Sequence, residues 1–208
     1  MKNMKRSTNF EVIEFKNIES SSGIPSEYVS GLGTCIESAF GGGITDEDAL
    51  GHMQGDQILI AVSKDIRPQI AGFSATTIET VENKGEIEHP SVVYPCAYFA
   101  AAAIAKVHQG RGLYSLLNDK RLEFVENEGI DRLYTRTQNH RVEQGISRAL
   151  DRMVDERRTK SFAVARYALI GVYGCMLTDT KPLARTVSYD NLDYERGDAN
   201  IVSWQLFT

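Results

Sequence analysis

The residues best suited to bind a ligand form a glycine-rich turn, Gln109-Gly110-Arg111-Gly112-Leu113. It follows an apolar run over residues 98–104 that is typical of a strand, and it opens residues 113–128, whose apolar residues recur mostly at helical spacing. The first N–H groups of a helix lack intrahelical partners and lie at the positive end of its dipole. Glycine lets such a backbone approach a phosphate closely. The turn therefore predicts a pyrophosphate site, and a purely structural turn is the alternative.

Two well-known phosphate-binding motifs do not fit these residues. The sequence has no Gly-x-x-x-x-Gly-Lys followed by Ser or Thr. A dinucleotide-binding fingerprint would need a small residue where Ser115 stands and an acidic residue where Thr137 and Gln138 stand. The phosphate site is therefore of another kind.

The composition of the chain limits the classes of protein to which it can belong. With 208 residues, 42% hydrophobic and 25% charged, the chain is expected to fold as one soluble domain over residues 1–208. A net charge of −5 argues against a nucleic-acid binder. Cys35, Cys96 and Cys175 lie far apart and predict neither disulfides nor a metal site, so no metal is expected. No apolar run is long enough for a membrane span, and a cytoplasmic location is the economical expectation.

The order of predicted elements is that of a mixed α/β fold around one sheet. The patterns predict strands over residues 9–16, 58–62, 70–78, 95–104, 133–137 and 201–207. They predict helices over residues 25–40, 45–55, 113–128 and 139–154. Residues 79–94 are expected to form a loop or an irregular strand extension. Residues 162–177 are apolar and fit either a strand or a helix.

The turn and this order of elements resemble the GNAT superfamily of acetyl-CoA-dependent N-acetyltransferases. The family signature is Gln/Arg-x-x-Gly-x-Gly/Ala; Gln109 and Gly112 match it, and Tyr114 departs from it. Asn139 matches the asparagine that commonly begins the helix after the family's fifth strand. The resemblance covers about residues 10–155 and is weak over 156–208. It implies a single α/β (α+β) domain with a mostly antiparallel sheet, flanking helices and two splayed parallel strands, here residues 95–104 and 133–137.

The resemblance also implies how acetyl-CoA binds. Backbone groups at Ile104, Ala105 and Lys106 would bond the pantetheine arm like an added strand. The Ile104 N–H would polarise the thioester carbonyl. Gln109, Gly110, Arg111, Gly112 and Leu113 would hold the pyrophosphate, with Arg111 adding charge, and Asn139 would reach the pantetheine arm.

The groups that move protons are harder to find. Amine acylation needs a route for the amine proton and an acid for the leaving thiolate. Ala100 to Ala103 offer only methyl groups where many family members place a glutamate, so a water relay to Glu86, Glu88, His89 or His108 is expected. Ile146 stands where the family's tyrosine acid is common, so Tyr173 or Tyr98 is expected to substitute. A plain surface or core role is the alternative for each.

Two functions follow from these expectations. The first is an N-acetyltransferase that moves an acetyl group from acetyl-CoA to a primary amine of a small molecule or peptide, by direct attack in a ternary complex. The second is a non-catalytic acetyl-CoA sensor or scaffold. Acidic residues Glu79, Glu82, Glu86 and Glu88 would attract a cationic amine, or form a solvated loop. Neither a nucleic acid nor a membrane is expected as a partner, and the apolar C-terminal segment can supply a strand to a homodimer.

Overall fold

The computed structural model describes residues 9–19, 23–41, 45–84, 92–169, 182–183, 189–193 and 197–208. These residues form two compact units. The first contains the described residues up to Thr77 together with Phe99–Phe124, and the second contains Ile78–Tyr98 and the described residues from Val125 onward. That the whole chain acts as one domain stays a prediction.

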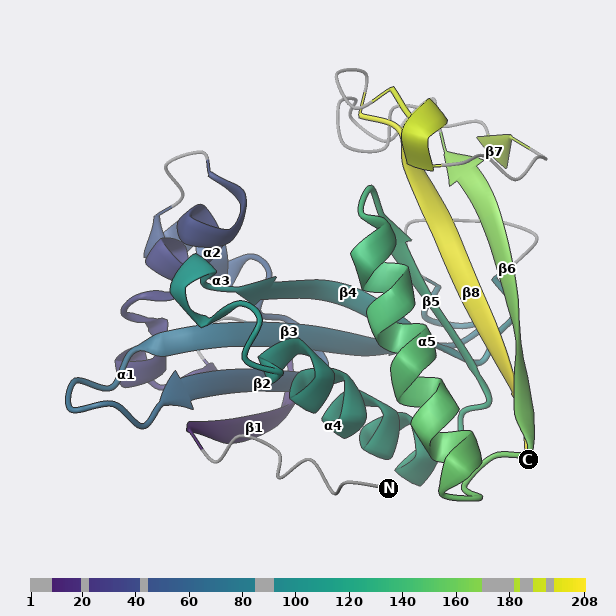
Figure 1. Ribbon diagram of the computed structural model, residues 1–208, viewed down its shortest axis with the longest axis horizontal. Coiled ribbons are helices and arrows are strands. Elements are labelled where there is room, and N and C mark those ends of the chain that lie inside the picture. The colour runs from purple at the N-terminus through teal and green to yellow at the C-terminus, as the bar shows by residue number, and fades with distance from the viewer. Residues whose placement is uncertain are drawn as a thin grey trace. The chain divides into compact units, whose positions relative to one another are not determined.

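The strands follow the order β1-β2-β3-β4-β5-β8-β6-β7 in one sheet (Figure 1). β4 and β5 pair in parallel, whereas β1 with β2, β2 with β3, β5 with β8, β8 with β6 and β6 with β7 pair antiparallel. The predicted mixed, mostly antiparallel sheet with flanking helices is therefore confirmed. The strands are β1 (Phe10–Ile18), β2 (Gly55–Ser63), β3 (Ile70–Glu79), β4 (Cys96–Ile104), β5 (Arg132–Thr137), β6 (Ser161–Leu169), β7 (Pro182–Leu183) and β8 (Ala199–Phe207).

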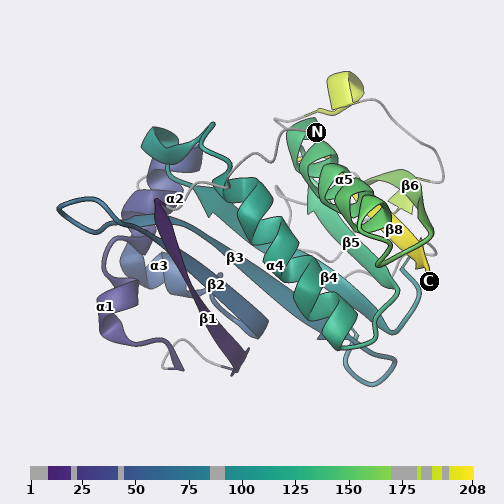
Figure 2. The same ribbon diagram turned by 60° about the horizontal axis from the view of Figure 1, so that its bottom comes forward.

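In the first unit, helices cover both faces of the strands. β2 and β3 are apolar almost throughout because both of their faces are buried. One apolar cluster joins Leu32 and Ile36 of α2 (Leu32–Phe40) to Ile60 of β2, with Ala49 of α3 (Asp46–Leu50) in the same cluster. A second cluster joins α4 (Leu113–Asn127) to Leu59, Ala61 and Ala71. Figure 2 shows α4 lying along β2 and β3.

The helix predicted over residues 25–40 is broken in two, and that prediction was wrong in its continuity. α1 covers Ser26–Val29, and α2 starts at Leu32 after Gly31, whose φ of 94° lies in the left-handed region. The Asp46 carboxylate accepts hydrogen bonds from the backbone of Gly31 (3.2 Å) and Gly33 (2.7 Å). The start of α2 is therefore capped by a side chain from α3, which is itself shorter than the predicted 45–55.

The second unit is built on β5, β8 and β6. β6 pairs with β8 along its whole length, which resolves the ambiguity of residues 162–169 in favour of a strand. Residues 170–177 of that apolar run lie outside the described residues. α5 (His140–Asp155) buries an apolar stripe of Ile146, Ala149, Leu150 and Met153. Its Ser147 Oγ accepts a hydrogen bond from Trp204 Nε1 at 3.0 Å, which ties α5 to β8.

Candidate functional site

The glycine turn has the conformation that a phosphate cradle needs. After β4, a short 3-10 helix, η2 (Lys106–His108), leads into Gly110 and Gly112, with φ angles of 74° and 79°. A β-carbon at either glycine would meet nothing within 4 Å, so the backbone conformation rather than packing requires glycine. Gly110, Arg111 and Gly112 are exposed, and α4 begins directly after them. The positive end of the α4 dipole therefore lies next to an exposed turn.

Hydrogen bonds within the turn hold it in place. Gln109 donates from Nε2 to the Ile104 carbonyl at 3.1 Å, so its side chain braces the turn. The Lys106 N–H donates to Ser38 Oγ at 2.7 Å, and the Ala105 N–H donates to the Ala71 carbonyl at 3.0 Å. The N–H groups of residues 105 and 106 are thus used within the first unit. This differs from the expectation that backbone groups near Lys106 are free for pantetheine.

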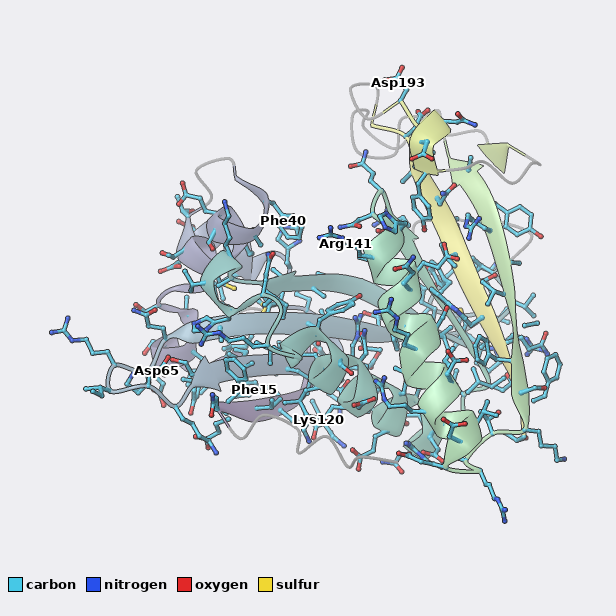
Figure 3. The ribbon with its side chains drawn as sticks, viewed as in Figure 1. Phe15, Phe40, Asp65, Lys120, Arg141 and Asp193 are labelled. Carbon is cyan, nitrogen blue, oxygen red and sulfur yellow. The ribbon has the colours of Figure 1, made fainter. Side chains whose placement is uncertain are left out.

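The end of α2 contributes apolar surface next to these bonds. Phe40, two residues after Ser38, is 71% exposed (Figure 3), and Val107, next to Lys106, is 67% exposed.

Tyr114, which departs from the family signature, does not obstruct the turn. Its hydroxyl oxygen is buried in the first unit, and burial raises the pKa of the phenol, with the nearby Arg121 guanidinium acting in the opposite direction. A side chain held in this way lies away from the exposed glycines. The buried Arg121 lies 3.8 Å from the centre of the Phe99 ring and donates to Thr76 Oγ1 and the Ala75 carbonyl.

His108, one of the expected proton carriers, is a packed residue. Its imidazole is 5% exposed and meets the Phe10 ring edge to face at 5.6 Å. Burial, and then the Arg111 charge, lower its pKa, while Asp65 acts in the opposite direction. The ring is therefore biased toward its neutral form. Glu88 and Tyr173, like Glu86 and His89, lie outside the described residues, and their roles stay predictions.

The alanines of β4 pack tightly. Ala103 is buried, and Ala100 and Ala101 pack against the cluster that contains α2. A β-carbon on Gly72 of β3 would come within 2.6 Å of Ile104 Cδ1 and 2.8 Å of the Ala103 carbonyl oxygen. Close packing thus explains the small residues at Gly72 and Ala103, whereas Ala100, Ala101 and Ala102 are only partly buried.

Parallel pairing of β4 with β5 is short. Its register consists of Ala97 opposite Leu133 and Tyr98 opposite Tyr134. The remaining residues of β4, Phe99 to Ile104, leave this ladder. The described pairing of β4 with β5 is thus confined to the first residues of β4.

A partly buried polar cluster lies where this ladder ends, and sequence reasoning had missed most of it. The Tyr98 and Tyr134 rings stack with centroids 4.6 Å apart. Tyr134 donates its hydroxyl to the Glu79 carboxylate at 2.8 and 2.9 Å, and Arg136 Nε donates to the Tyr98 hydroxyl at 2.7 Å. Glu79 is only 3% exposed, so the expectation that it belongs to a solvated acidic loop was wrong. Its position as the last residue of the apolar strand β3 was the signal available in the sequence.

Asn139 begins α5, as predicted. Its Oδ1 accepts a hydrogen bond from the Arg141 N–H at 2.9 Å, and its own N–H donates to Thr137 Oγ1 at 2.9 Å. The side chain is exposed. Its contact with pantetheine stays a prediction.

A cavity of the second unit lies at the start of α5. It has a volume of about 410 Å³ and is lined by His140, Arg166, Tyr189 and Asp190. The Glu143 carboxylate accepts hydrogen bonds from Arg166 Nε at 2.9 Å and from the Tyr189 hydroxyl at 2.8 Å. The cavity is therefore lined by one cationic side chain, Arg166, and one anionic side chain, Asp190.

Comparison with known proteins establishes the fold. No protein-family model matches the sequence, and no curated protein matches it either. Among solved structures, Arabidopsis thaliana NAA60 in complex with a bisubstrate analogue superposes with a TM-score of 0.53 at 12% identity, covering 95% of this chain and 100% of that one. Chaetomium thermophilum Naa20, also with a bisubstrate analogue, gives 0.51 at 14% identity, with 95% and 86% covered. A protein provisionally assigned as a phosphinothricin N-acetyltransferase gives 0.52 at 12% identity, with 95% and 99% covered.

The chain has the GNAT fold. In this GNAT fold the glycine turn stands between β4 and the helix that follows, as the sequence predicted. Among the described residues, no group of three or more His, Cys, Asp or Glu side chains gathers as metal ligands would. None of the described helices combines the length and apolar composition needed to cross a bilayer.

Proposed function

We propose that the chain is an acetyl-CoA-dependent N-acetyltransferase that acts on a primary amine of a small molecule or peptide. The observation that carries this proposal is the exposed turn with two left-handed glycines, placed between β4 and α4 of a GNAT fold. Each of these features has simpler explanations when taken alone. Their combination favours a pyrophosphate ligand attached to an acyl carrier.

The donor would bind along β4. Backbone N–H groups of Gly110, Arg111, Gly112 and Leu113 would receive the pyrophosphate, with the Arg111 guanidinium adding charge. The pantetheine arm would follow the part of β4 beyond its ladder with β5, and the Ile104 N–H would polarise the thioester carbonyl. Because Ser38 and Ala71 already engage the N–H groups of Lys106 and Ala105, we assign those two residues to supporting the cradle.

The acceptor amine would attack the thioester directly while both substrates are bound. Two structures of the same fold hold a bisubstrate analogue, which supports simultaneous occupation of donor and acceptor sites. The amine must be neutral and must lose a proton. The burial of His108 supports a packing role for it, so the proposed water relay leads to Glu86, Glu88 or His89.

A second function, a non-catalytic acetyl-CoA sensor or scaffold, is favoured by one observation. Ile146, at the family's tyrosine position, is a fully buried core residue of α5. If no other group replaced that tyrosine, the chain would keep the donor site without its chemistry.

Release of free CoA thiol distinguishes the two functions. The purified protein would be incubated with acetyl-CoA and a panel of small amines and peptide N-termini, and the thiol would be measured against background hydrolysis. Mass spectrometry of the panel after incubation with labelled acetyl-CoA would identify the acceptor. Transfer to at least one amine supports the enzyme, and saturable acetyl-CoA binding with no transfer supports the sensor.

A further inference from the structure

Ser38 places a hydroxyl group beside the backbone that leads from β4 into the glycine turn. It lies on α2, and its Oγ accepts a hydrogen bond from the Lys106 N–H at 2.7 Å. Ser38 is partly exposed and Lys106 is exposed. Ser38, the end of β4 and the glycine turn all belong to the first unit. The hydroxyl is therefore anchored at a backbone position that lies, along the chain, between Ile104 and the turn.

A second residue of α2 holds this helix against the same backbone. Cys35, three residues before Ser38, is buried in one apolar cluster with Ala103 and Ala105. Burial raises the pKa of the Cys35 thiol, and the Ala105 backbone beside its sulfur acts in the opposite direction. Residues three apart share one face of a helix. The face of α2 that carries Cys35 and Ser38 therefore packs along the backbone of residues 105 and 106.

The Ser38 hydroxyl can still donate its own proton. A hydroxyl group has one proton to donate and two lone pairs that accept, and the Lys106 N–H occupies one lone pair. A serine inside a helix often donates to the carbonyl one turn earlier. In the described part of the chain, however, no carbonyl or carboxylate accepts a hydrogen bond from Ser38. The hydrogen bond from Lys106 also polarises the hydroxyl, which makes it a better donor.

Two backbone donors that a strand-like ligand would use here are already engaged. The Ala105 N–H donates to the Ala71 carbonyl at 3.0 Å, and the Lys106 N–H donates to Ser38. A ligand that lies along a strand needs donors for its amide carbonyls, because main-chain hydrogen bonds give this binding mode its affinity. The Ser38 hydroxyl can supply the hydrogen bond that the Lys106 N–H would otherwise have made.

We propose that Ser38 binds the acyl donor by donating a hydrogen bond from its hydroxyl to an amide carbonyl of the pantetheine arm; this rests on the function proposed above. The Lys106 N–H donates to Ser38 Oγ, and Ser38 donates in turn to the pantetheine carbonyl. The side chain thus carries the backbone donor outward by one hydroxyl group. No covalent bond forms or breaks at Ser38. The contact requires only that acetyl-CoA binds, so it holds for the enzyme and for the sensor alike.

Isothermal titration of acetyl-CoA into four proteins tests the contact. Ser38→Ala removes the hydroxyl and should raise the dissociation constant about fivefold, which corresponds to one ordinary hydrogen bond. Ser38→Thr keeps a hydroxyl and should stay within about twofold of wild type. Ser30→Ala is the matched control, because Ser30 is an exposed serine directly after α1 in the same unit, and it should keep wild-type affinity.

CoA analogues separate a direct contact from a purely structural effect. In each of two analogues, one pantetheine amide is replaced by a hydrocarbon link of the same length, so that one carbonyl is lost. Wild type and Ser38→Ala should bind one of these analogues equally, because the contact is already missing from that pair. A loss in Ser38→Ala that persists with acetyl-CoA and with both analogues would show that Ser38 only braces Lys106, and would overturn the contact.

The same titrations distinguish failure of this contact from failure of the donor site. No binding of acetyl-CoA by wild type would overturn the proposed donor site, and the Ser38 contact with it. The Ser38 contact alone fails when wild type binds acetyl-CoA and Ser38→Ala binds it equally well.

Discussion

At Asn139, one side chain is proposed to serve two purposes. Its Oδ1 caps α5 through the Arg141 N–H, and the resemblance to GNAT enzymes implies a contact with pantetheine. An N-cap asparagine replaced by alanine costs roughly 1 kcal/mol. Replacement by serine keeps a capping oxygen and removes the amide.

These substitutions separate the two purposes. Asn139→Ala should lower the free energy of unfolding by about 1 kcal/mol in urea, and Asn139→Ser should lower it by much less. If the amide contacts pantetheine, both variants should bind acetyl-CoA more weakly than wild type. Wild-type affinity in Asn139→Ser would limit the residue to capping.

The cysteines Cys35 and Cys96 are buried, as the sequence predicted, and Cys175 lies outside the described residues. Burial raises the pKa of Cys35 to about 11, and burial followed by the Glu79 charge raises that of Cys96 to about 12. Because these folded values exceed the ordinary 9.0, the protonated thiols favour the folded state below pH 9.0, and this contribution is lost as pH rises through 11 to 12.

Slow thiol labelling is the expected consequence. In a Cys175→Ser variant at about pH 8, a disulfide reagent should modify Cys35 and Cys96 far more slowly than in the urea-unfolded chain, since the thiolate is the reactive form. Reactivity should increase as the pH approaches the raised values. Rapid modification of both thiols in the folded protein would contradict their burial.

At the scale of elements, α2 depends on a residue from another helix. The Asp46 carboxylate accepts the Gly31 and Gly33 N–H groups, and α2 in turn supplies Ser38 to the Lys106 N–H below the glycine turn. A hydrogen bond to a charged group contributes about 1.5–3 kcal/mol to the free energy of unfolding. Asp46 therefore supports the glycine turn indirectly, because it caps α2 and α2 holds the backbone before that turn.

Asp46→Ala should lower the free energy of unfolding by about 2 kcal/mol, measured by chemical denaturation. Asp46→Asn retains one acceptor oxygen and serves as the matched control, with a smaller loss. Glu47→Ala, on the same short helix, has no part in this cap and should be close to neutral. Equal stability of Asp46→Ala and Glu47→Ala would contradict the cap.

Elements marked by local signals could be predicted, and those set by distant partners could not. Asn139 before an amphipathic stripe, and glycines between an apolar run and a helix, act within a few residues, so α5 and the turn were predicted correctly. The break at Gly31 depends on Asp46, 15 residues away. β6 is a strand because it pairs with β8, and Glu79 is buried because Tyr134 lies beside it, 55 residues along the chain.

At the scale of the whole molecule, the fold is recognisable where sequence similarity is not. The chain superposes on structures of 12% and 14% identity with TM-scores of 0.53 and 0.51. The donor site proposed above rests on this fold together with the glycine turn between β4 and α4. The acceptor depends on individual side chains, and two of the acidic residues predicted to attract it, Glu86 and Glu88, lie outside the described part of the chain.

The most direct test is an isothermal titration of acetyl-CoA into three proteins. Gly112→Trp places a bulky side chain at the proposed pyrophosphate cradle. Gly129→Trp is the matched control, because Gly129 also has a left-handed φ, 69°, and also has nothing within 4 Å of an added β-carbon. We predict saturable binding by wild type and Gly129→Trp, and binding weakened by about tenfold or more, or 1.4 kcal/mol, in Gly112→Trp. Equal affinity in all three proteins, or no binding by wild type, would contradict the site.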